Sequence, residues 1–163
     1  MIEQKDYKNF ASKDTTRKHL NYANIIANKA YFTDGHRMLT LNNANLDDGV
    51  YCPKTLEMVN TNQPYQQVAK LSPSLTGAIQ ITVKIPLMFK YLKTTLATGT
   101  LSVFLDFDGR FQFNKPVDYL TCLNPTFLRE LGGETVEINI IDKLSPIVIS
   151  TSEQEILIMP RRA

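Results

Sequence analysis

The sequence has few features of a disulfide-bonded, secreted or membrane-spanning protein. Its two cysteines, Cys52 and Cys122, lie far apart and lack CxxC spacing. We therefore expect no disulfide framework, and a cytoplasmic, reducing compartment. No segment approaches the roughly 18 unbroken apolar residues that a membrane span needs, so no membrane association is expected. The polar start, residues 1–14, does not resemble a secretory signal or a transit peptide.

Motifs for nucleophilic catalysis and phosphate binding are also missing. The chain has no GxSxG, no GxxxxGK[ST] and no GxGxxG. His36 lies close to Asp34 and could form half of an acid–base pair, but catalysis needs a nucleophile or a third orienting group. The residues predict no enzyme and no cofactor, although an enzyme based on His36 and Asp34 is kept as an alternative.

A metal site is not expected either. Neither histidine, His19 or His36, has a partner at ligand spacing, and neither cysteine has one. The bulk composition is that of an ordinary globular protein, with 163 residues, 43% of them hydrophobic and 21% charged. The net charge of +2 is too small to argue for nucleic acid by itself.

The first half of the chain is typical of short strands. The pattern predicts a strand over Leu20–Ile26 and a hairpin formed by Ala30–Thr33 and Arg37–Leu41. Asp34 and Gly35 stand between the hairpin strands, and Asp-Gly favours a type I′ turn, in which both central residues have positive φ. The segment 42–49 is a loop by composition, and 50–76 is expected to be a connector that packs along the fold.

The second half repeats one order of elements, which is strand, helix, then further strands. A strand at Ile79–Ile85 precedes a helix that starts at Pro86, where proline is well tolerated. Its expected apolar face is made by Leu87, Met88, Tyr91, Leu92 and Thr95. A hairpin, Leu101–Phe107 with Arg110–Phe113, follows. The second unit has a strand at Val117–Leu123, a helix capped by Asn124, and strands at Thr135–Ile141, Pro146–Thr151 and Glu155–Met159. The expected fold is α+β, an antiparallel sheet with two covering helices.

Two distant stretches carry a family resemblance. TDGHRM, residues 33–38, follows a strand, and EILIMPRRA, residues 155–163, is an apolar strand that runs into Met-Pro and two arginines. Together they resemble the bacterial sliding clamp, the beta subunit of DNA polymerase III, whose domains are built from βαβββ units. The resemblance implies a DNA-clamp-like fold. It assigns residues 1–72 to a partial middle domain with its connector, and 73–163 to the C-terminal domain.

In that family the two segments form the walls of a groove that binds short peptide motifs of DNA polymerases and other clamp clients. RKHLN at 17–21, NPTF at 124–127 and DKLSPIVI at 142–149 also resemble groove segments of the family. The resemblance therefore implies peptide-binding roles for Leu20, Thr33, Gly35, His36, Arg37, Met38, Asn124, Phe127, Leu144, Pro146, Leu157, Ile158, Met159, Pro160 and Arg161.

The resemblance also implies a departure from the family, because we expect residues 1–163 to hold no counterpart of the first domain and only part of the middle one. A clamp ring around double-stranded DNA would need several copies, a homo-oligomer, with Lys90, Lys93 and Arg129 contacting phosphates. The alternatives are an adaptor or decoy for clamp clients that forms no ring, and a virion structural protein that uses the fold without DNA. So reduced a replication protein would suit a phage or mobile element.

Overall fold

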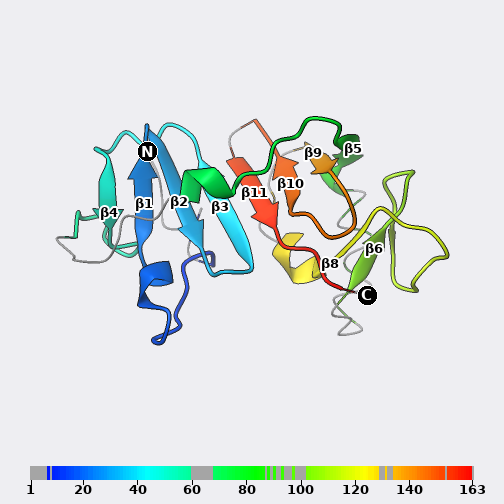
Figure 1. Cartoon of the computed structure of the whole chain (residues 1–163), viewed down its shortest axis with the longest axis horizontal. Helices are drawn as coiled ribbons and strands as arrows, with labels where there is room; N and C mark the ends of the chain where they lie inside the picture. The colour runs from blue at the N-terminus through cyan, green and yellow to red at the C-terminus, as the bar shows by residue number, and fades with distance from the viewer. Residues whose placement is uncertain are drawn as a thin grey trace. The chain divides into compact units, whose positions relative to one another are not determined.

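The chain divides into two compact units. The computed structural model describes residues 7, 9–59, 68–86, 88, 90, 93, 97, 102–128, 131, 134–152 and 154–162. The first unit comprises Met1–Pro73 with Ser152–Leu157, and the second comprises Ser74–Thr151 with Ile158–Ala163. Each unit is described below by itself (Figure 1).

The first unit contains a twisted antiparallel sheet. Its strands are β1 (Ala23–Ile26), β2 (Lys29–Thr33), β3 (Arg37–Leu41) and β4 (Gly49–Tyr51), with β11 (Gln154–Ile158) beside β3. The order is β4-β1-β2-β3-β11. Both hairpins close at defined registers, with Ile26 opposite Lys29 and Thr33 opposite Met38. The predicted hairpin is therefore confirmed.

The turn types differ from the prediction. Gly35 has φ +89°, but Asp34 is not among the residues with positive φ, so this turn is not type I′. Two consecutive residues with positive φ occur instead at Ala27 (48°) and Asn28 (62°), between β1 and β2. The type I′ pattern therefore falls on Ala-Asn, where alanine gives no turn signal.

The strands of the first unit are buried along most of their length. In β2 and β3, Lys29 is exposed and Arg37 half-buried, and every other residue is buried. Phe32 is fully buried, and the Tyr7 ring stacks on it with centroids 4.2 Å apart. Such stacking stabilises the pair beyond what the burial of the two apolar rings contributes. The N-terminal segment is thereby held against the sheet.

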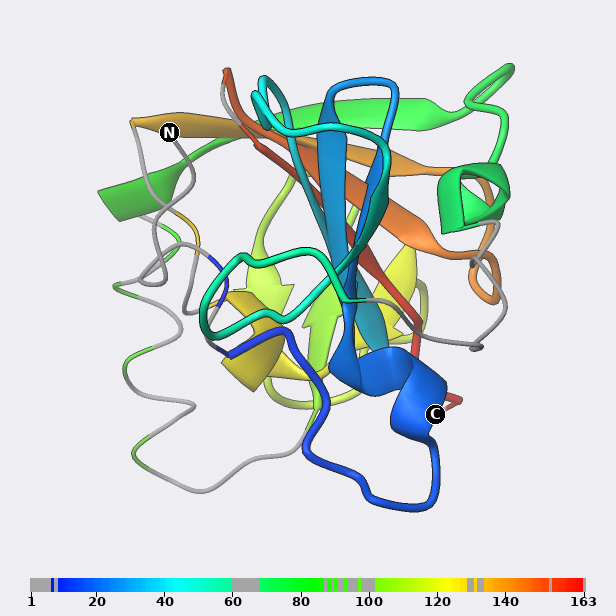
Figure 2. The same cartoon turned by 90° about the vertical axis from the view of Figure 1, so that its left-hand side faces the viewer.

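The expected strand at Leu20–Ile26 is only partly correct. Residues Lys18–Asn21 form a 3-10 helix, η1, and the strand begins at Ala23. The Leu20 amide donates to the carbonyl of Arg17 at 2.9 Å, which satisfies it locally rather than in the sheet. Figure 2 shows η1 at the end of β1. The expected connector, 50–76, begins in β4 and includes the 3-10 helix η2 (Val68–Leu71).

The second unit contains two groups of strands. The first group has the order β10-β9-β5 and consists of β5 (Ile79–Lys84), β9 (Thr135–Ile140) and β10 (Ile147–Ser150). The second group has the order β7-β6-β8 and consists of β6 (Val103–Leu105), β7 (Phe111–Gln112) and β8 (Thr121–Leu123). The pairs within each group are antiparallel, as predicted. The predicted strand at Val117–Leu123 is shorter, because only its last three residues pair with β6.

The two predicted helices have different outcomes. Among residues 85–97, the described positions Ile85, Pro86, Met88, Lys90, Lys93 and Ala97 are helical. The helix is therefore present where it is described; of its expected apolar face, Leu87, Tyr91, Leu92 and Thr95 lie outside the described residues. The second helix is a 3-10 helix, η3 (Pro125–Leu128), in the part that the structure describes. The α+β class is confirmed, with sheet predominating.

Candidate peptide-binding residues

The turn between β2 and β3 is fixed by its own side chains. The Asp34 carboxylate accepts from the backbone N–H groups of His36 at 2.9 Å and Arg37 at 3.0 Å. The Thr33 hydroxyl donates to the Arg37 carbonyl at 2.8 Å and accepts from the Gly35 N–H at 3.1 Å. Short polar side chains commonly organise turns in this way. The carboxylate next to His36 therefore has a structural role in the turn.

Arg37 joins this turn to the N-terminal segment. Its Nε donates to Asp34 at 3.2 Å, and its Nη2 donates to the carbonyl of Asn9 at 2.6 Å. The guanidinium carbon lies 4.3 Å from the centre of the Phe10 ring. Because only 9% of the Arg37 side chain is exposed, these contacts are largely shielded from water. Arg37 therefore anchors the turn, and little of its side chain is exposed to contact a peptide.

Gly35 lies close to Arg17 and Leu20. A Cβ atom added at Gly35 would meet Arg17 Nη1 at 2.7 Å and Leu20 Cδ1 at 3.2 Å. Arg17 also forms an ion pair with Asp14, with 2.9 Å between Nε and Oδ2. Hydrogen bonds from the Thr16 hydroxyl and then from Arg17 hold the pKa of Asp14 well below its usual range. The structure therefore brings together Leu20 and Gly35, two of the sequence-predicted site residues.

Exposure differs among the predicted residues of the first unit. Gly35 and His36 are exposed. Leu20 and Met38 are buried, with relative exposures of 8% and 2%, and Leu157 is buried at 5%. Thr33 is buried at 7%, and its hydroxyl is used in hydrogen bonds within the turn. In the first unit, the exposed predicted residues are thus histidine and glycine, and the apolar ones are buried.

The chain after β11 presents an exposed apolar residue in the second unit. Ile158 is fully buried, whereas Met159 is 44% exposed. Pro160 is half-buried, and Arg161 is exposed. The Arg161 N–H donates to the carbonyl of Cys122 at 2.8 Å, which ties this segment to β8. The burial of Cys122 raises the pKa of its thiol.

Asn124 follows β8 and acts as the predicted cap. Its Oδ1 accepts from the N–H of Thr126 at 3.0 Å and from the Thr126 hydroxyl at 2.8 Å. Phe127 is half-buried in the short helix η3. Cys122, which accepts the hydrogen bond from Arg161, lies two residues before Asn124. The cap and Arg161 are therefore in the same part of the second unit.

Leu144 and Pro146 lie in and after a tight turn. The Asp142 carboxylate accepts from the N–H groups of Leu144 and Ser145, each at 2.7 Å. Leu144 is 63% exposed and Pro146 is half-buried. The neighbouring Lys143 forms an ion pair with Asp118, with 3.3 Å between Nζ and Oδ1. This ion pair joins the turn to Asp118, and among the described residues no interaction joins it to Asn124.

The basic residues predicted to contact DNA are described only in part. Lys90 and Lys93 are helical and exposed, and Arg129 lies outside the described residues.

Within the described part of the chain, no three histidine, cysteine or acidic side chains cluster as metal ligands. Among the same residues, no helix is long and apolar enough to cross a membrane.

Sequence reasoning missed the residues that support the turn. Asn9 and Phe10 contact Arg37 from 27 or more positions away, and no local pattern predicts this. The ion pair of Asp14 with Arg17 has i, i+3 spacing, a signal that was available in the sequence.

Comparison with solved structures identifies the fold. No protein-family model matches the chain, and no curated protein sequence does. The DNA polymerase III beta chain of Streptococcus pneumoniae matches with a TM-score of 0.74 and 15% identity, covering 98% of this chain and 62% of that one. The beta subunit of Thermotoga maritima matches with a TM-score of 0.70 and 17% identity, covering 98% and 63%.

A third match is the sliding clamp of Bartonella birtlesii bound to griselimycin, with a TM-score of 0.69, 12% identity and coverage of 98% and 63%. Identities this low show the fold alone. The chain thus spans less than two thirds of the length of the solved clamps it matches. Over nearly its whole described length, it has the fold of the DNA polymerase III beta sliding clamp, in partial form.

Proposed function

We propose that the chain binds short peptide motifs of DNA replication or repair proteins, among them a DNA polymerase. One observation carries this proposal. In a chain with the clamp fold, the turn within TDGHRM is held by hydrogen bonds to Asp34 and exposes Gly35 and His36, and the MPRR segment presents Met159 and Arg161 on the surface. These are the segments in which the sequence resembles the family's peptide-binding groove.

The chemistry of the two segments suits a mixed polar and apolar ligand. The exposed side chain of His36 offers hydrogen bonds, and Met159 offers a flexible apolar contact that adapts to different side chains. Burial of one or two large peptide side chains at about 25 cal/mol per Å², less the cost of ordering, supports an affinity of the order of micromolar. We propose that each of the two segments contributes contacts to such a peptide.

This role needs no catalysis, no metal and no cofactor. We propose further that residues 1–72 correspond to part of the clamp middle domain and 73–163 to its C-terminal domain. A processivity factor and an adaptor or decoy for clamp clients would both use the same peptide contacts. A virion protein that only uses the fold would not, so peptide binding separates the last alternative from the others.

Lys90 and Lys93 support a second candidate function, the binding of double-stranded DNA by several copies of the chain. Both are exposed on the described part of one helix. Contacts to phosphates release counterions, so such binding would weaken steeply with salt, whereas peptide binding would change little. Anisotropy of a labelled duplex at 50 and 200 mM salt, with wild type and a Lys90→Glu/Lys93→Glu variant, tests this.

The direct test of the proposed function is fluorescence anisotropy of a labelled peptide of the QLxLF type. The control is the same peptide with alanine at the two leucines and the phenylalanine. We expect saturable binding near the micromolar range for the first peptide and none for the control. Equal binding of both peptides, or none at high protein concentration, would refute the proposal.

A further inference from the structure

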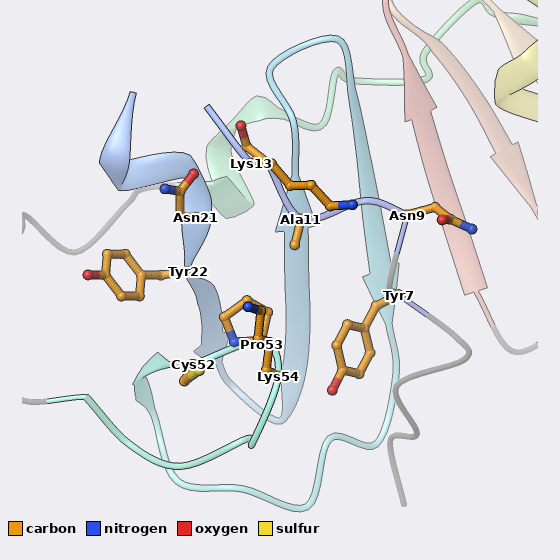
Figure 3. A pocket seen from close by; sticks show the side chains of 10 residues that line it. Tyr7, Asn9, Ala11, Lys13, Asn21, Tyr22, Cys52, Pro53 and Lys54 are labelled. Carbon is orange, nitrogen blue, oxygen red and sulfur yellow. The ribbon is translucent and has the colours of Figure 1, made fainter. Parts of the chain in front are cut away.

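The first unit contains a large open cavity that none of the predicted peptide-binding residues lines. Its volume is about 650 Å³, within the range of small-molecule sites. Three parts of the first unit line it: Tyr7 and Asn9 with residues 11–13, the pair Asn21-Tyr22, and residues 52–54 after β4. Figure 3 shows their side chains grouped around Ala11, with Lys13 on one side and Pro53 and Lys54 on the other.

The charged residues that line the described walls of the cavity are both lysines. Its described lining residues are Tyr7, Asn9, Ala11, Ser12, Lys13, Asn21, Tyr22, Cys52, Pro53 and Lys54. Lys13 and Lys54 are exposed, and neither forms an ion pair with a described residue. Among the described residues no acidic side chain lines the cavity, so an anion placed there meets two ammonium groups and no repulsion from these walls.

One wall of the cavity carries an aromatic side chain. Tyr22 lines the cavity beside Asn21 and is half-buried, so its side chain is partly accessible to an occupant. The Asn21 Oδ1 atom itself is shielded from solvent, so it does not face the open cavity.

Cys52 supplies a reporter for this cavity. The backbone N–H of Lys54, and after it the N–H and hydroxyl of Thr55, lower the pKa of the Cys52 thiol. Cys52 is half-buried, whereas the other cysteine, Cys122, is fully buried. Alkylating reagents should therefore modify Cys52 selectively, and an occupant of the cavity should protect it.

We propose that this cavity binds an aromatic organic anion of about nucleotide size, which carries a phosphate or carboxylate group. The anionic group pairs with Lys13 and Lys54. The ring lies against Tyr22. The proposal does not depend on the peptide-binding function, and different residues carry it.

Calorimetric titration of the whole chain with two matched pairs of compounds tests the proposal. AMP is compared with adenosine, and N-acetyltryptophan with N-acetyltryptophanamide; in each pair only the first member carries the anion. We expect at least one anion to bind about tenfold more tightly than its neutral counterpart, because charge-assisted hydrogen bonds are lost in the latter. Preferential binding of AMP would identify phosphate as the preferred anionic group, and preferential binding of N-acetyltryptophan would identify carboxylate. Binding of neither anion, or equal binding within each pair, would overturn the proposal.

Variants place the binding in this cavity. Lys13→Ala/Lys54→Ala should remove the preference for the anion, whereas Lys29→Ala/Lys70→Ala, at exposed lysines outside the cavity, should keep it. The bound anion should also slow iodoacetamide modification of Cys52 in wild type, as read by mass spectrometry. Anion binding that survives the first double variant and leaves Cys52 unprotected would place the ligand elsewhere and refute the assignment.

Discussion

The guanidinium of Arg37 lies 4.3 Å from the centre of the Phe10 ring while it donates to Asp34 and to the carbonyl of Asn9. One side chain thus connects the turn between β2 and β3 with the N-terminal segment. Lysine cannot reproduce the planar, multidentate contact. We expect Arg37→Lys to lower the free energy of unfolding by about 1–3 kcal/mol in urea titrations.

A matched control for this substitution is Arg110→Lys. Arg110 pairs with Asp108 at 3.6 Å, but its side chain is 67% exposed. An exposed pair of this kind contributes little, so the change should stay within about 0.5 kcal/mol of wild type. Equal effects of the two substitutions would show that Arg37 is not an anchor.

Gly35 has a left-handed backbone conformation in the turn between β2 and β3. Gly35→Ala adds a Cβ to a residue whose φ is +89°. Gly77→Ala adds one to a residue whose φ is +77°, where no atom would lie within 4 Å of the new Cβ. Each should lose about 1–2 kcal/mol of stability from the left-handed conformation. At Gly35 the nearest atom is the flexible end of Arg17, so little extra loss is expected. Peptide affinity, measured by anisotropy, should fall only for Gly35→Ala; an equal fall for Gly77→Ala would contradict this.

The exposed apolar residue of the C-terminal segment should be required for peptide binding. Met159→Asp puts a charge where an apolar peptide side chain is proposed to bind, and we expect at least a tenfold loss of affinity, or about 1.4 kcal/mol. Met58 is 57% exposed and lies outside the proposed site, so Met58→Asp is the control. Unchanged affinity in a folded Met159→Asp variant would exclude Met159 from the site.

The turn at 142–145 should make a pH-dependent contribution to stability. Hydrogen bonds from the Ser145 hydroxyl, and then from the N–H groups of Leu144 and Ser145, lower the pKa of Asp142. A folded-state pKa below the unfolded value gives stability that is present above about pH 4 and is lost as pH falls through the folded pKa. The urea midpoints of wild type and Asp142→Asn should therefore differ at pH 7 and converge toward pH 2.5. A difference that is constant over this range would contradict the assignment.

Local patterns predicted strands better than they predicted turns and contacts. Asp-Gly marked the hairpin at residues 34–35 correctly, because glycine supplies a positive φ there. The turn at Ala27 and Asn28 was missed, because alanine rarely adopts positive φ and its position depends on the pairing of whole strands. Leu20 was assigned to a strand because it is apolar, but its burial is provided by a 3-10 helix.

The segments of the candidate site are a prediction from the sequence, and their internal contacts could not be predicted. The motifs TDGHRM and MPRR are read directly from the chain. The burial of Met38 and the anchoring of Arg37 arise from residues distant in sequence, as does the hydrogen bond of Arg161 to Cys122. Such long-range contacts are set by packing, on which a short motif carries no information.

The most direct test of the central claim is amide hydrogen exchange of the whole chain, with and without a saturating QLxLF-type peptide. The bound peptide should slow exchange at residues 33–38 and, read separately, at residues 157–161. The alanine-substituted control peptide should leave both unchanged. Protection of both segments is the predicted result; protection of neither would contradict the claim that these segments bind the peptide, and protection of only one would exclude the other from binding.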